Sequence, residues 1–343
     1  MMTGRLLPVE KSWGTGIAMK KDELKKYLAT RRMGWPYEDS YHVDNMGGHR
    51  FVAKIGDELA GLSYAEVSDN GKEAVMKMNL KGQYAEYGIG TELLELLMED
   101  LQNSGLETIR YEIPRERYAF QIYRNLGFTV ERQDEETVRF IWRRTILVTA
   151  FEPFGGETLN PTAEVLGMLP DESSGYAIRK LLLPVEYGRS AEIAISEYDR
   201  LQPAAVIMLG QAGGRSAISP ETSAKNLMDC EAPDNAGYIA DHERISEKGP
   251  DTLSSTLPVG KIVDVLAARD IPCEISDDAG TYVCNSLFYS MLDHNRGDVP
   301  TGFIHVPYIK EQGHTDKPFM EISDICMAIE VIIETISANG EIR

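Results

Sequence analysis

Residues 145–151 read Thr-Ile-Leu-Val-Thr-Ala-Phe, a mainly apolar run between Arg144 and Glu152. Apolar runs of this length are typical of strands that are buried on both faces of a parallel sheet. Downstream of it, similar runs alternate with segments of helical spacing. This alternation predicts an α/β/α sandwich with a mainly parallel, twisted sheet. We expect its strands at 145–151, 177–185, 204–211, 273–278 and 302–308, and its helices at 161–169, 187–201, 258–269, 283–293 and 319–338.

The part of the chain before residue 144 has a different pattern, in which strands surround one strongly amphipathic helix. Leucines recur at helical spacing from Leu93 to Leu101, directly after Gly88-Ile-Gly90. The sequence therefore predicts an α+β domain over 1–143 and a separate α/β domain over 144–343. In the first domain we expect further helices at 20–32 and 118–126, and strands at 50–55, 60–67, 74–80 and 108–113 before two final strands.

Charge is unevenly distributed between these two parts. Residues 1–143 carry 20 Lys and Arg against 23 Asp and Glu, whereas 144–343 carry 15 against 31. An acidic surface repels phosphate backbones and anionic lipids, so we expect neither nucleic acid nor membrane partners. The N-terminal residues contain no apolar signal core, and the expected location is the cytoplasm. The four cysteines lack the spacing of a metal site or a disulfide framework.

Cys284 stands apart from the other cysteines because of its position. It follows Asp278-Ala-Gly-Thr-Tyr-Val283 and begins a segment with the apolar spacing of a helix. Unpaired N–H groups and the helix dipole at such an N-terminus favour a thiolate, which is the nucleophilic form of cysteine. Cys284 is thus the candidate nucleophile, whereas Cys230, Cys273 and Cys326 are most simply small buried residues.

A nucleophilic thiol needs a base, and His305 is the candidate. It lies in the apolar strand Gly302-Phe-Ile-His-Val306, at the end where open α/β sheets bind ligands. By itself, such a residue is better explained as a buried core histidine. The other five histidines lie in polar, turn-like stretches and are interpreted as surface residues. Glu221, which follows the glycine-containing loop 210–220, is a candidate to orient the base.

Taken together, these segments resemble the pyrrolidone carboxyl peptidases, also called pyroglutamyl peptidase I, over essentially all of 144–343. Four blocks carry the resemblance: Thr149-Ala-Phe-Glu-Pro-Phe-Gly-Gly-Glu-Thr-Leu-Asn-Pro161, Gly210-Gln-Ala-Gly-Gly-Arg215 with Pro220-Glu221, Ala279-Gly-Thr-Tyr-Val-Cys-Asn285, and Gly302-Phe-Ile-His-Val-Pro-Tyr308. The resemblance implies a cysteine exopeptidase that removes N-terminal pyroglutamate from peptides. It assigns Cys284 as nucleophile, His305 as base and Glu221 as the group that orients His305.

The same resemblance implies a binding site for the pyroglutamyl ring. Phe151 and Phe154 would flank the flat lactam, although plain core packing also explains them, and Gln211 would lie near the ring. Neither a cofactor nor a metal is implied, and the family suggests a homo-oligomer. Two departures from the family pattern concern substrate preference: Thr222-Ser-Ala-Lys-Asn226 after the glutamate, and Glu231 at a position that is frequently basic.

The first domain resembles the GNAT N-acetyltransferases over roughly 45–142. The resemblance rests on Gly88-Ile-Gly90 and on Ala119-Phe-Gln-Ile-Tyr-Arg-Asn-Leu-Gly-Phe128. It implies that the backbone of Gly88, Ile89, Gly90 and Thr91 holds the pyrophosphate of acetyl-CoA. Tyr123 would protonate the departing CoA thiolate, or would simply be a buried aromatic residue. Ala85 occupies the place of a family Gln or Arg, so one side chain of the phosphate site is missing.

Three readings of the whole chain follow. In the first, a peptidase is fused to an enzyme that transfers acetyl from acetyl-CoA to an unknown amine. In the second, the first domain only binds CoA or acts as a scaffold. In the third, the second domain binds peptides without turnover, which the complete set of Cys284, His305 and Glu221 argues against.

Overall fold

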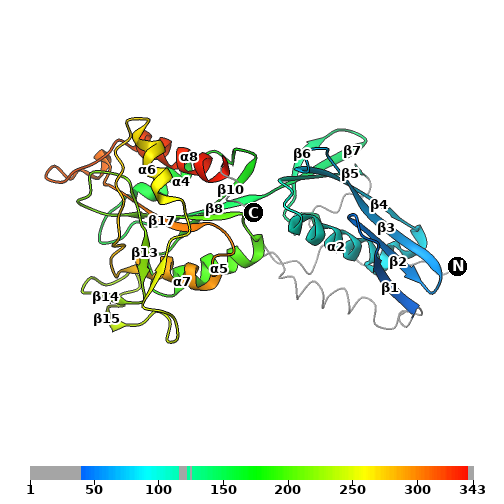
Figure 1. The fold of residues 1–343 in the computed structure, drawn as a ribbon, viewed down its shortest axis with the longest axis horizontal. Coiled ribbons are helices and arrows are strands. Elements are labelled where there is room, and N and C mark those ends of the chain that lie inside the picture. The colour runs from blue at the N-terminus through cyan, green and yellow to red at the C-terminus, as the bar shows by residue number, and fades with distance from the viewer. Residues whose placement is uncertain (1–39, 116–121, 124–125, 339–343) are drawn as a thin grey trace. The chain divides into compact units, whose positions relative to one another are not determined.

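The computed structural model describes residues 40–115, 122–123 and 126–338. The chain divides into two compact units, Met1–Trp142 and Arg143–Arg343, each with its own sheet (Figure 1). The helix predicted over 20–32 and most of that predicted over 118–126 lie outside the described residues. Within the described ranges, no helix is long and apolar enough to cross a membrane.

The first unit is built on a seven-stranded sheet with the order β1-β2-β3-β4-β5-β7-β6. Neighbouring strands from β1 to β4 are antiparallel, whereas β4 and β5 are parallel. The predicted strands and the amphipathic helix are present, but β1 and the short helix η3 were not predicted. The elements are β1 (Tyr41–Asn45), β2 (Arg50–Ile55), β3 (Glu58–Val67), β4 (Glu73–Leu80), η3 (Gly82–Tyr87), α2 (Ile89–Asn103), β5 (Thr108–Pro114), β6 (Thr129–Gln133) and β7 (Thr137–Arg143).

Helix α2 fills the core of the first unit. Leu93, Leu97 and Leu101 recur on one face and are completely buried, as the leucine spacing predicted. Ser63 in β3 donates a hydrogen bond of 3.0 Å to the carbonyl of Leu93, which ties the sheet to the helix. The helix therefore packs its apolar face on the sheet and leaves its polar residues on the outside.

The second unit contains a six-stranded sheet with the order β12-β17-β11-β8-β10-β9. Its four central strands, β17, β11, β8 and β10, are all parallel. The elements are β8 (Thr145–Phe151), α4 (Pro161–Met168), β9 (Glu172–Ser173), β10 (Tyr176–Leu183), α5 (Arg189–Leu201), β11 (Ala205–Gln211), β12 (Ser219–Pro220), β13 (Ser223–Lys225), β14 (Met228–Cys230), β15 (Ala240–Glu243), β16 (Thr252–Ser254), α6 (Val259–Ala267), α7 (Val283–Asn295), β17 (Thr301–Val306), η5 (Lys310–Gln312) and α8 (Ile322–Ala338).

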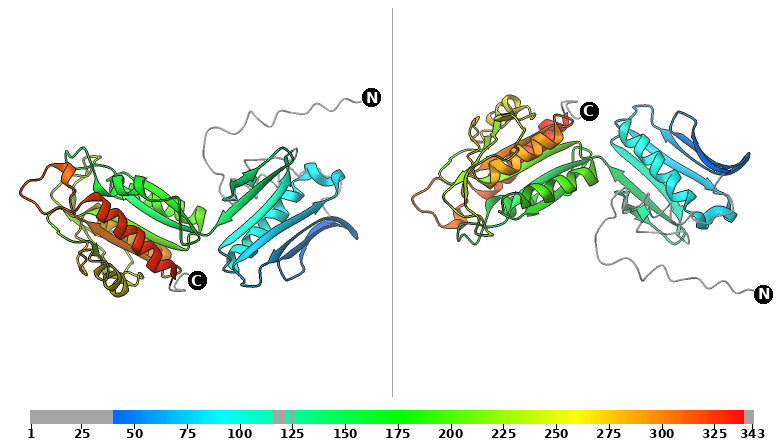
Figure 2. Two further views of the ribbon diagram at one scale, coloured as in Figure 1. Left: turned by 90° about the horizontal axis from the view of Figure 1, so that it is seen from above. Right: turned by 90° about the horizontal axis from the view of Figure 1, so that it is seen from below.

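Strand β8 shows why this sheet is covered on both faces. Ile146, Val148 and Ala150 belong to one hydrophobic core, and Leu147 and Phe151 belong to another. Successive side chains of a strand point to opposite faces, so both faces of β8 are buried, as predicted. Helices α4, α6 and α8 cover the first face, and α5 and α7 cover the second (Figure 2). The expected α/β/α sandwich is therefore confirmed.

The strand predicted over 273–278 is wrong. This segment makes only isolated bridges, from Cys273 to Ile218 and from Ser276 to Glu221. Backbone hydrogen bonds do join 272–276 to 218–222, but Pro220 has no N–H to donate, which interrupts the ladder. The strand predicted over 177–185 ends at Leu183, because the next residue, Pro184, has no backbone N–H to donate.

Buried polar bonds fix the end of α7. Asn295 is completely buried and accepts hydrogen bonds from the Tyr198 hydroxyl (2.8 Å) and from the backbone N–H of Val299 (3.1 Å). Its amide donates to the Val299 carbonyl (2.7 Å) and to the Thr301 hydroxyl (2.8 Å). One side chain thus joins α5, α7 and the start of β17.

We expect Asn295→Ala to lower the free energy of unfolding of the second unit by roughly 2–4 kcal/mol, because buried partners lose their hydrogen bonds. Urea unfolding followed by near-UV circular dichroism measures this as a difference between the variant and the native chain, because the first unit is the same in both. Tryptophan fluorescence does not, since all three tryptophans precede residue 143. The control Glu192→Ala, on the exposed side of α5, should cost less than about 0.5 kcal/mol. Equal losses in the two variants would contradict the expectation.

Candidate active site

Cys284 is the second residue of α7, at the helix N-terminus where the sequence predicted it. The N-cap residue Tyr282 is extended, and no side chain caps the helix. Gly280 has a left-handed φ of 77°, and its N–H donates to the Asp278 carboxylate at 3.0 Å, which fixes the turn before the helix. The thiol therefore lies beside a helix turn whose first N–H groups are not occupied by a capping side chain.

His305 comes from the parallel strand β17, next to β11. Its register partner is Gly210, which also lies against the thiol. A Cβ atom at position 210 would be 3.0 Å from Cys284 Sγ and 2.6 Å from the Phe303 ring. Only glycine leaves room for this approach, so Gly210 allows Cys284 and His305 to meet at the same edge of the sheet.

Glu221 is hydrogen-bonded to the histidine that it was predicted to orient. His305 Nδ1 and Glu221 Oε1 are 2.7 Å apart, and the glutamate is completely buried. Arg215 donates to the same oxygen at 2.8 Å and to the Asp278 carbonyl at 3.0 Å. Arg215 was not predicted as a site residue. The signal was present, since a basic residue in a loop of glycines beside a buried carboxylate is a natural counter-ion.

The electrostatics of these groups follow from their burial and their partners. Burial opposes ionisation of Glu221, but the His305 hydrogen bond and the Arg215 charge lower the pKa of this carboxyl below its usual value. Burial lowers the pKa of His305, and Glu221 only partly counteracts it. Burial also raises the pKa of the Cys284 thiol to about 12, with a further contribution from Glu221.

The resting site therefore contains an ionised Glu221, a neutral His305 and a protonated Cys284. The sequence predicted that the helix N-terminus favours a thiolate, and burial acts in the opposite direction. The N–H of Cys284 and the charge of Arg215 do favour the thiolate, but burial outweighs both. A protonated thiol must give its proton to a base before the sulfur can carry a thiolate charge, and His305 is the base that lines the same cavity.

A cavity of about 490 Å³ joins the candidate residues. Cys284 and His305 line it, together with the predicted ring-binding residues Phe151, Phe154 and Gln211. Glu221 does not line it, because it lies behind the imidazole. Further lining residues that the sequence did not single out are Glu157, Asn160, Arg215, Asp278, Tyr282 and Tyr308. The cavity combines aromatic walls with several polar and charged side chains that could orient a small ligand.

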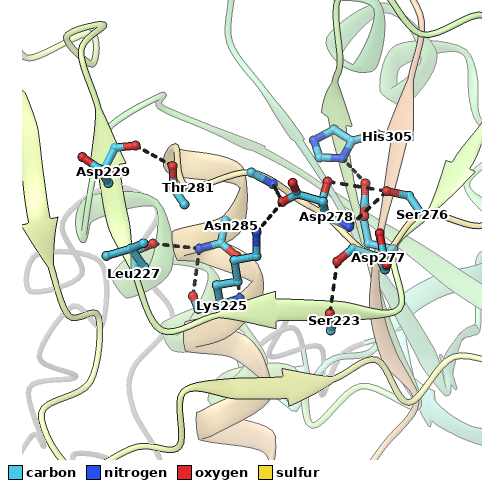
Figure 3. A network of polar contacts seen from close by, with 12 residues as sticks. Ser223, Lys225, Leu227, Asp229, Ser276, Asp277, Asp278, Thr281, Asn285 and His305 are labelled. Carbon is cyan, nitrogen blue, oxygen red and sulfur yellow. Dashed lines mark hydrogen bonds and ion pairs between the residues drawn. The ribbon is translucent and has the colours of Figure 1, made fainter.

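A polar network holds the start of α7 in place (Figure 3). Asn285, the residue after the nucleophile, is completely buried and accepts a hydrogen bond from the Lys225 N–H at 2.8 Å. Its amide donates to the carbonyls of Lys225 and Leu227, both at 2.9 Å. The Lys225 side chain also pairs with Asp278 at 2.9 Å. The segment around β13 thus fixes the backbone on both sides of Cys284.

Comparisons with known proteins agree with this site. The sequence model of the pyroglutamyl peptidase family matches residues 144–339. The chain belongs to the pyroglutamyl peptidase family. It is 42% identical over 196 residues to pyrrolidone-carboxylate peptidase 1 of Caldanaerobacter subterraneus subsp. tengcongensis, covering 56% of this chain and 97% of that protein. It is 43% identical over 195 residues to the pyrrolidone-carboxylate peptidase of Thermococcus onnurineus, covering 55% of this chain and 97% of that protein.

Solved structures of the family have the same fold as the second unit. Pyroglutamyl peptidase I from Bacillus amyloliquefaciens aligns with a TM-score of 0.56 and 34% identity, covering 57% of this chain and 96% of that chain. A mutant pyrrolidone carboxyl peptidase from Pyrococcus furiosus aligns with a TM-score of 0.54 and 37% identity, covering 56% and 97%. The family model begins at residue 144, so it carries no information about the first unit.

The two departures from the family pattern, residues 222–226 and Glu231, differ in what they contact in the second unit. Thr222 bonds through its N–H and its hydroxyl to the Ser276 carbonyl, at 2.7 and 3.1 Å, which is a structural role. Glu231 is exposed. Lys225, within the first departure, forms the ion pair with the cavity-lining residue Asp278. Of these changes, only Lys225 contacts a residue of the cavity wall.

Most of the predicted surface histidines bond to nearby carboxylates, but His314 is more than a surface residue. It is half-buried, its ring centroid lies 4.2 Å from that of Tyr308, and it bonds to Glu157 at 2.9 Å. Tyr308 and Glu157 both line the cavity. His314 therefore supports the cavity wall from outside.

In the first unit, the four residues that were predicted to bind acetyl-CoA lie at the N-terminus of helix α2. Gly88, Ile89, Gly90 and Thr91 form the start of α2, where Gly88 has a φ of 77° and no side chain caps the helix. Contrary to the expectation, this turn does not directly follow a strand, because η3 lies between it and β4. The Ile89 side chain is completely buried and belongs to the core, so only its backbone could contact a ligand.

Tyr123 is also buried in the first unit. Its ring packs against Phe140, with centroids 4.5 Å apart, and against Tyr111 at 5.6 Å. Burial raises the pKa of its phenol, so it remains protonated at neutral pH. These surroundings agree with the interpretation of Tyr123 as a core residue, and a protonated phenol is also what a proton donor requires.

The pKa shifts predict how peptidase activity depends on pH. A protonated imidazole cannot accept the thiol proton, and burial lowers the pKa of His305 from 6.5. We therefore expect kcat/KM for a pyroglutamyl amide to stay level through neutral pH and to fall only below pH 6.5.

The variant Glu221→Gln tests whether protonation of His305 causes the loss of activity at acid pH. Glu221 raises the pKa of His305, so its removal should move the acid limb to still lower pH. We also expect kcat to fall by roughly 10³- to 10⁴-fold, because the imidazolium loses its carboxylate partner. An acid limb that moves to higher pH would contradict this account.

Proposed function

We propose that the second unit removes N-terminal pyroglutamate from peptides as a cysteine exopeptidase. The proposal rests on one observation. Cys284 and His305 line the same cavity, and Glu221 is hydrogen-bonded to Nδ1 of His305. Membership of the pyroglutamyl peptidase family supports the same activity. The substrate is a peptide whose first residue is a neutral five-membered lactam.

The first half of the reaction forms a thioester. The Cys284 thiol gives its proton to His305 as the sulfur attacks the pyroglutamyl carbonyl carbon. Backbone N–H groups at the uncapped start of α7 stabilise the oxyanion. Glu221 stabilises the imidazolium, which then protonates the departing amine as the C–N bond breaks. The products of this half are the shortened peptide and a pyroglutamyl thioester of Cys284.

The second half regenerates the enzyme. His305 accepts a proton from water, which attacks the thioester carbonyl. The C–S bond breaks, the thiolate takes the proton back from His305, and pyroglutamate leaves. The aromatic residues Phe151 and Phe154 supply walls for the ring throughout both steps. No step needs a group beyond the substrate, water and these side chains.

Cleavage of a pyroglutamyl amide that releases a fluorescent amine tests this proposal. We expect Cys284→Ser to lose at least about 10³-fold in kcat, because a serine in the same place is a much poorer nucleophile. Cys326→Ser is the matched control, since Cys326 lies in α8 and does not line the cavity. It should cleave like the native chain.

Two outcomes would count against the proposal. Retention of activity by Cys284→Ser would place the nucleophile elsewhere. Absence of cleavage by a well-folded native chain would favour a unit that binds peptides without turnover.

We further propose, as a separate activity, that the first unit binds acetyl-CoA and transfers acetyl to an amine. Two features support this. The parallel strands β4 and β5 pair only over 73–76 and 108–111, so their C-terminal parts do not pair with one another. Helix α2 begins with N–H groups that no side chain caps, which suits a phosphate. The alternative is a scaffold or a module that binds CoA without catalysis.

Binding of acetyl-CoA to the full chain, measured by calorimetry, separates these alternatives. We expect Thr91→Glu to weaken binding at least about fivefold, because a carboxylate at the start of α2 repels phosphate. Ser104→Glu, at the exposed opposite end of α2, is the control and should bind like the native chain. If the native chain does not bind acetyl-CoA, the scaffold alternative is favoured. If Thr91→Glu and Ser104→Glu bind acetyl-CoA equally well, the ligand binds away from the start of α2.

A further inference from the structure

Two glutamine side chains meet at the wall of the cavity. Gln211, the last residue of β11, lines the cavity, and Gln312, the last residue of η5, lies behind it. The Gln312 amide donates to Gln211 Oε1 at 2.9 Å. An amide side chain can present either a donor or an acceptor, so the direction of this bond determines what Gln211 offers to a ligand.

The orientation of Gln312 is set by the backbone. The Ile309 N–H donates to Gln312 Oε1 at 3.1 Å, and Gln312 Nε2 donates to the Leu159 carbonyl at 3.4 Å. A backbone N–H can only donate and a backbone carbonyl can only accept. Rotating the Gln312 amide by 180° would place N–H against N–H and oxygen against oxygen, so only one orientation is compatible with both contacts.

The loop that carries Gln312 is itself held firmly. The Met320 N–H donates to the Tyr308 carbonyl at 2.9 Å, which closes the loop at its base. Within the loop, His314 packs on the Tyr308 ring and bonds to Glu157. Gln312 is therefore fixed against the cavity wall by contacts on both sides of it.

The orientation of Gln211 follows from that of Gln312. Because Gln312 presents N–H groups, Gln211 must turn its oxygen toward them, and its own Nε2 is left on the other side. Among the residues that the structure describes, nothing accepts a hydrogen bond from Gln211 Nε2. Gln211 thus offers the cavity a donor and not an acceptor.

We propose that Gln312 is a positioning residue that sets the polarity of the Gln211 amide and thereby selects a ligand with a hydrogen-bond acceptor. This inference rests on the proposed peptidase function, in which the acceptor is the lactam carbonyl oxygen of pyroglutamate. A proline ring has nearly the same size but lacks this carbonyl. It would leave the Gln211 N–H unpaired in the cavity, and sites built to bond a polar group reject analogues that lack it.

Two substitutions of Gln312 distinguish this role from simple packing. Glu has the same shape as Gln and still accepts from the Ile309 N–H, but it presents an oxygen to Gln211 and also to the Leu159 carbonyl. Gln211 must then rotate and offer its oxygen to the cavity. Met removes all three hydrogen bonds of the Gln312 side chain and leaves Gln211 free to adopt either orientation. If Gln312 only packs against its neighbours, Gln312→Glu should raise KM less than Gln312→Met does. If Gln312 orients Gln211, Gln312→Glu should raise KM more.

The measurement is kcat and KM for a pyroglutamyl amide, together with the thermal midpoint of each variant. We expect Gln312→Glu to raise KM roughly 10- to 100-fold and Gln312→Met to raise it less, with kcat within about threefold of native in both.

A double-substitution cycle tests whether Gln312 acts through Gln211. In a Gln211→Met background, Gln312→Glu should change KM by less than about twofold, since no amide is left to reorient. A full effect in that background, an unchanged KM in Gln312→Glu, or a larger KM in Gln312→Met would each overturn the proposal. These results need an active native chain, so they are distinct from failure of the peptidase function itself, in which the native chain does not cleave.

Discussion

The peptidase site depends on one constraint, the ionisation of a completely buried carboxylate. Glu221 has no exposed surface, and a lone charge in such a place would be strongly destabilised. Its charge is tolerated because His305 and Arg215 both contact Oε1. Arg215 is held in turn by the Asp278 carbonyl, and Asp278 fixes the turn that leads to Cys284. The counter-ion of the carboxylate and the nucleophile are therefore positioned by the same loop.

The same burial explains why the resting site is neutral at the reacting atoms. It raises the pKa of Cys284 and lowers that of His305, so the thiol keeps its proton and the imidazole stays ready to accept it. A buried neutral pair avoids the cost of holding a thiolate and an imidazolium in a site of low polarity. When the thiol gives its proton to the imidazole, Glu221 can stabilise the resulting positive charge.

Much of this could be predicted from the sequence, because local patterns carry the relevant physics. The apolar run 145–151 predicted a strand buried on both faces, and the spacing after Val283 predicted the helix that begins beside Cys284. The strand over 273–278 could not be excluded in the same way. Its residues resemble a strand locally, but whether a continuous ladder forms depends on the segment that pairs with it, in which Pro220 donates no N–H.

The sequence by itself determined which chemical groups this protein has available: a thiol at a helix start, a histidine at a strand end and a carboxylate after a glycine loop. Only the tertiary structure decided their charge states and polarity. The pKa of Cys284 depends on burial by segments far away in the chain, and the orientation of Gln211 depends on Gln312, about a hundred residues later. Desolvation and hydrogen-bond direction arise from contacts in space, which no local sequence pattern records.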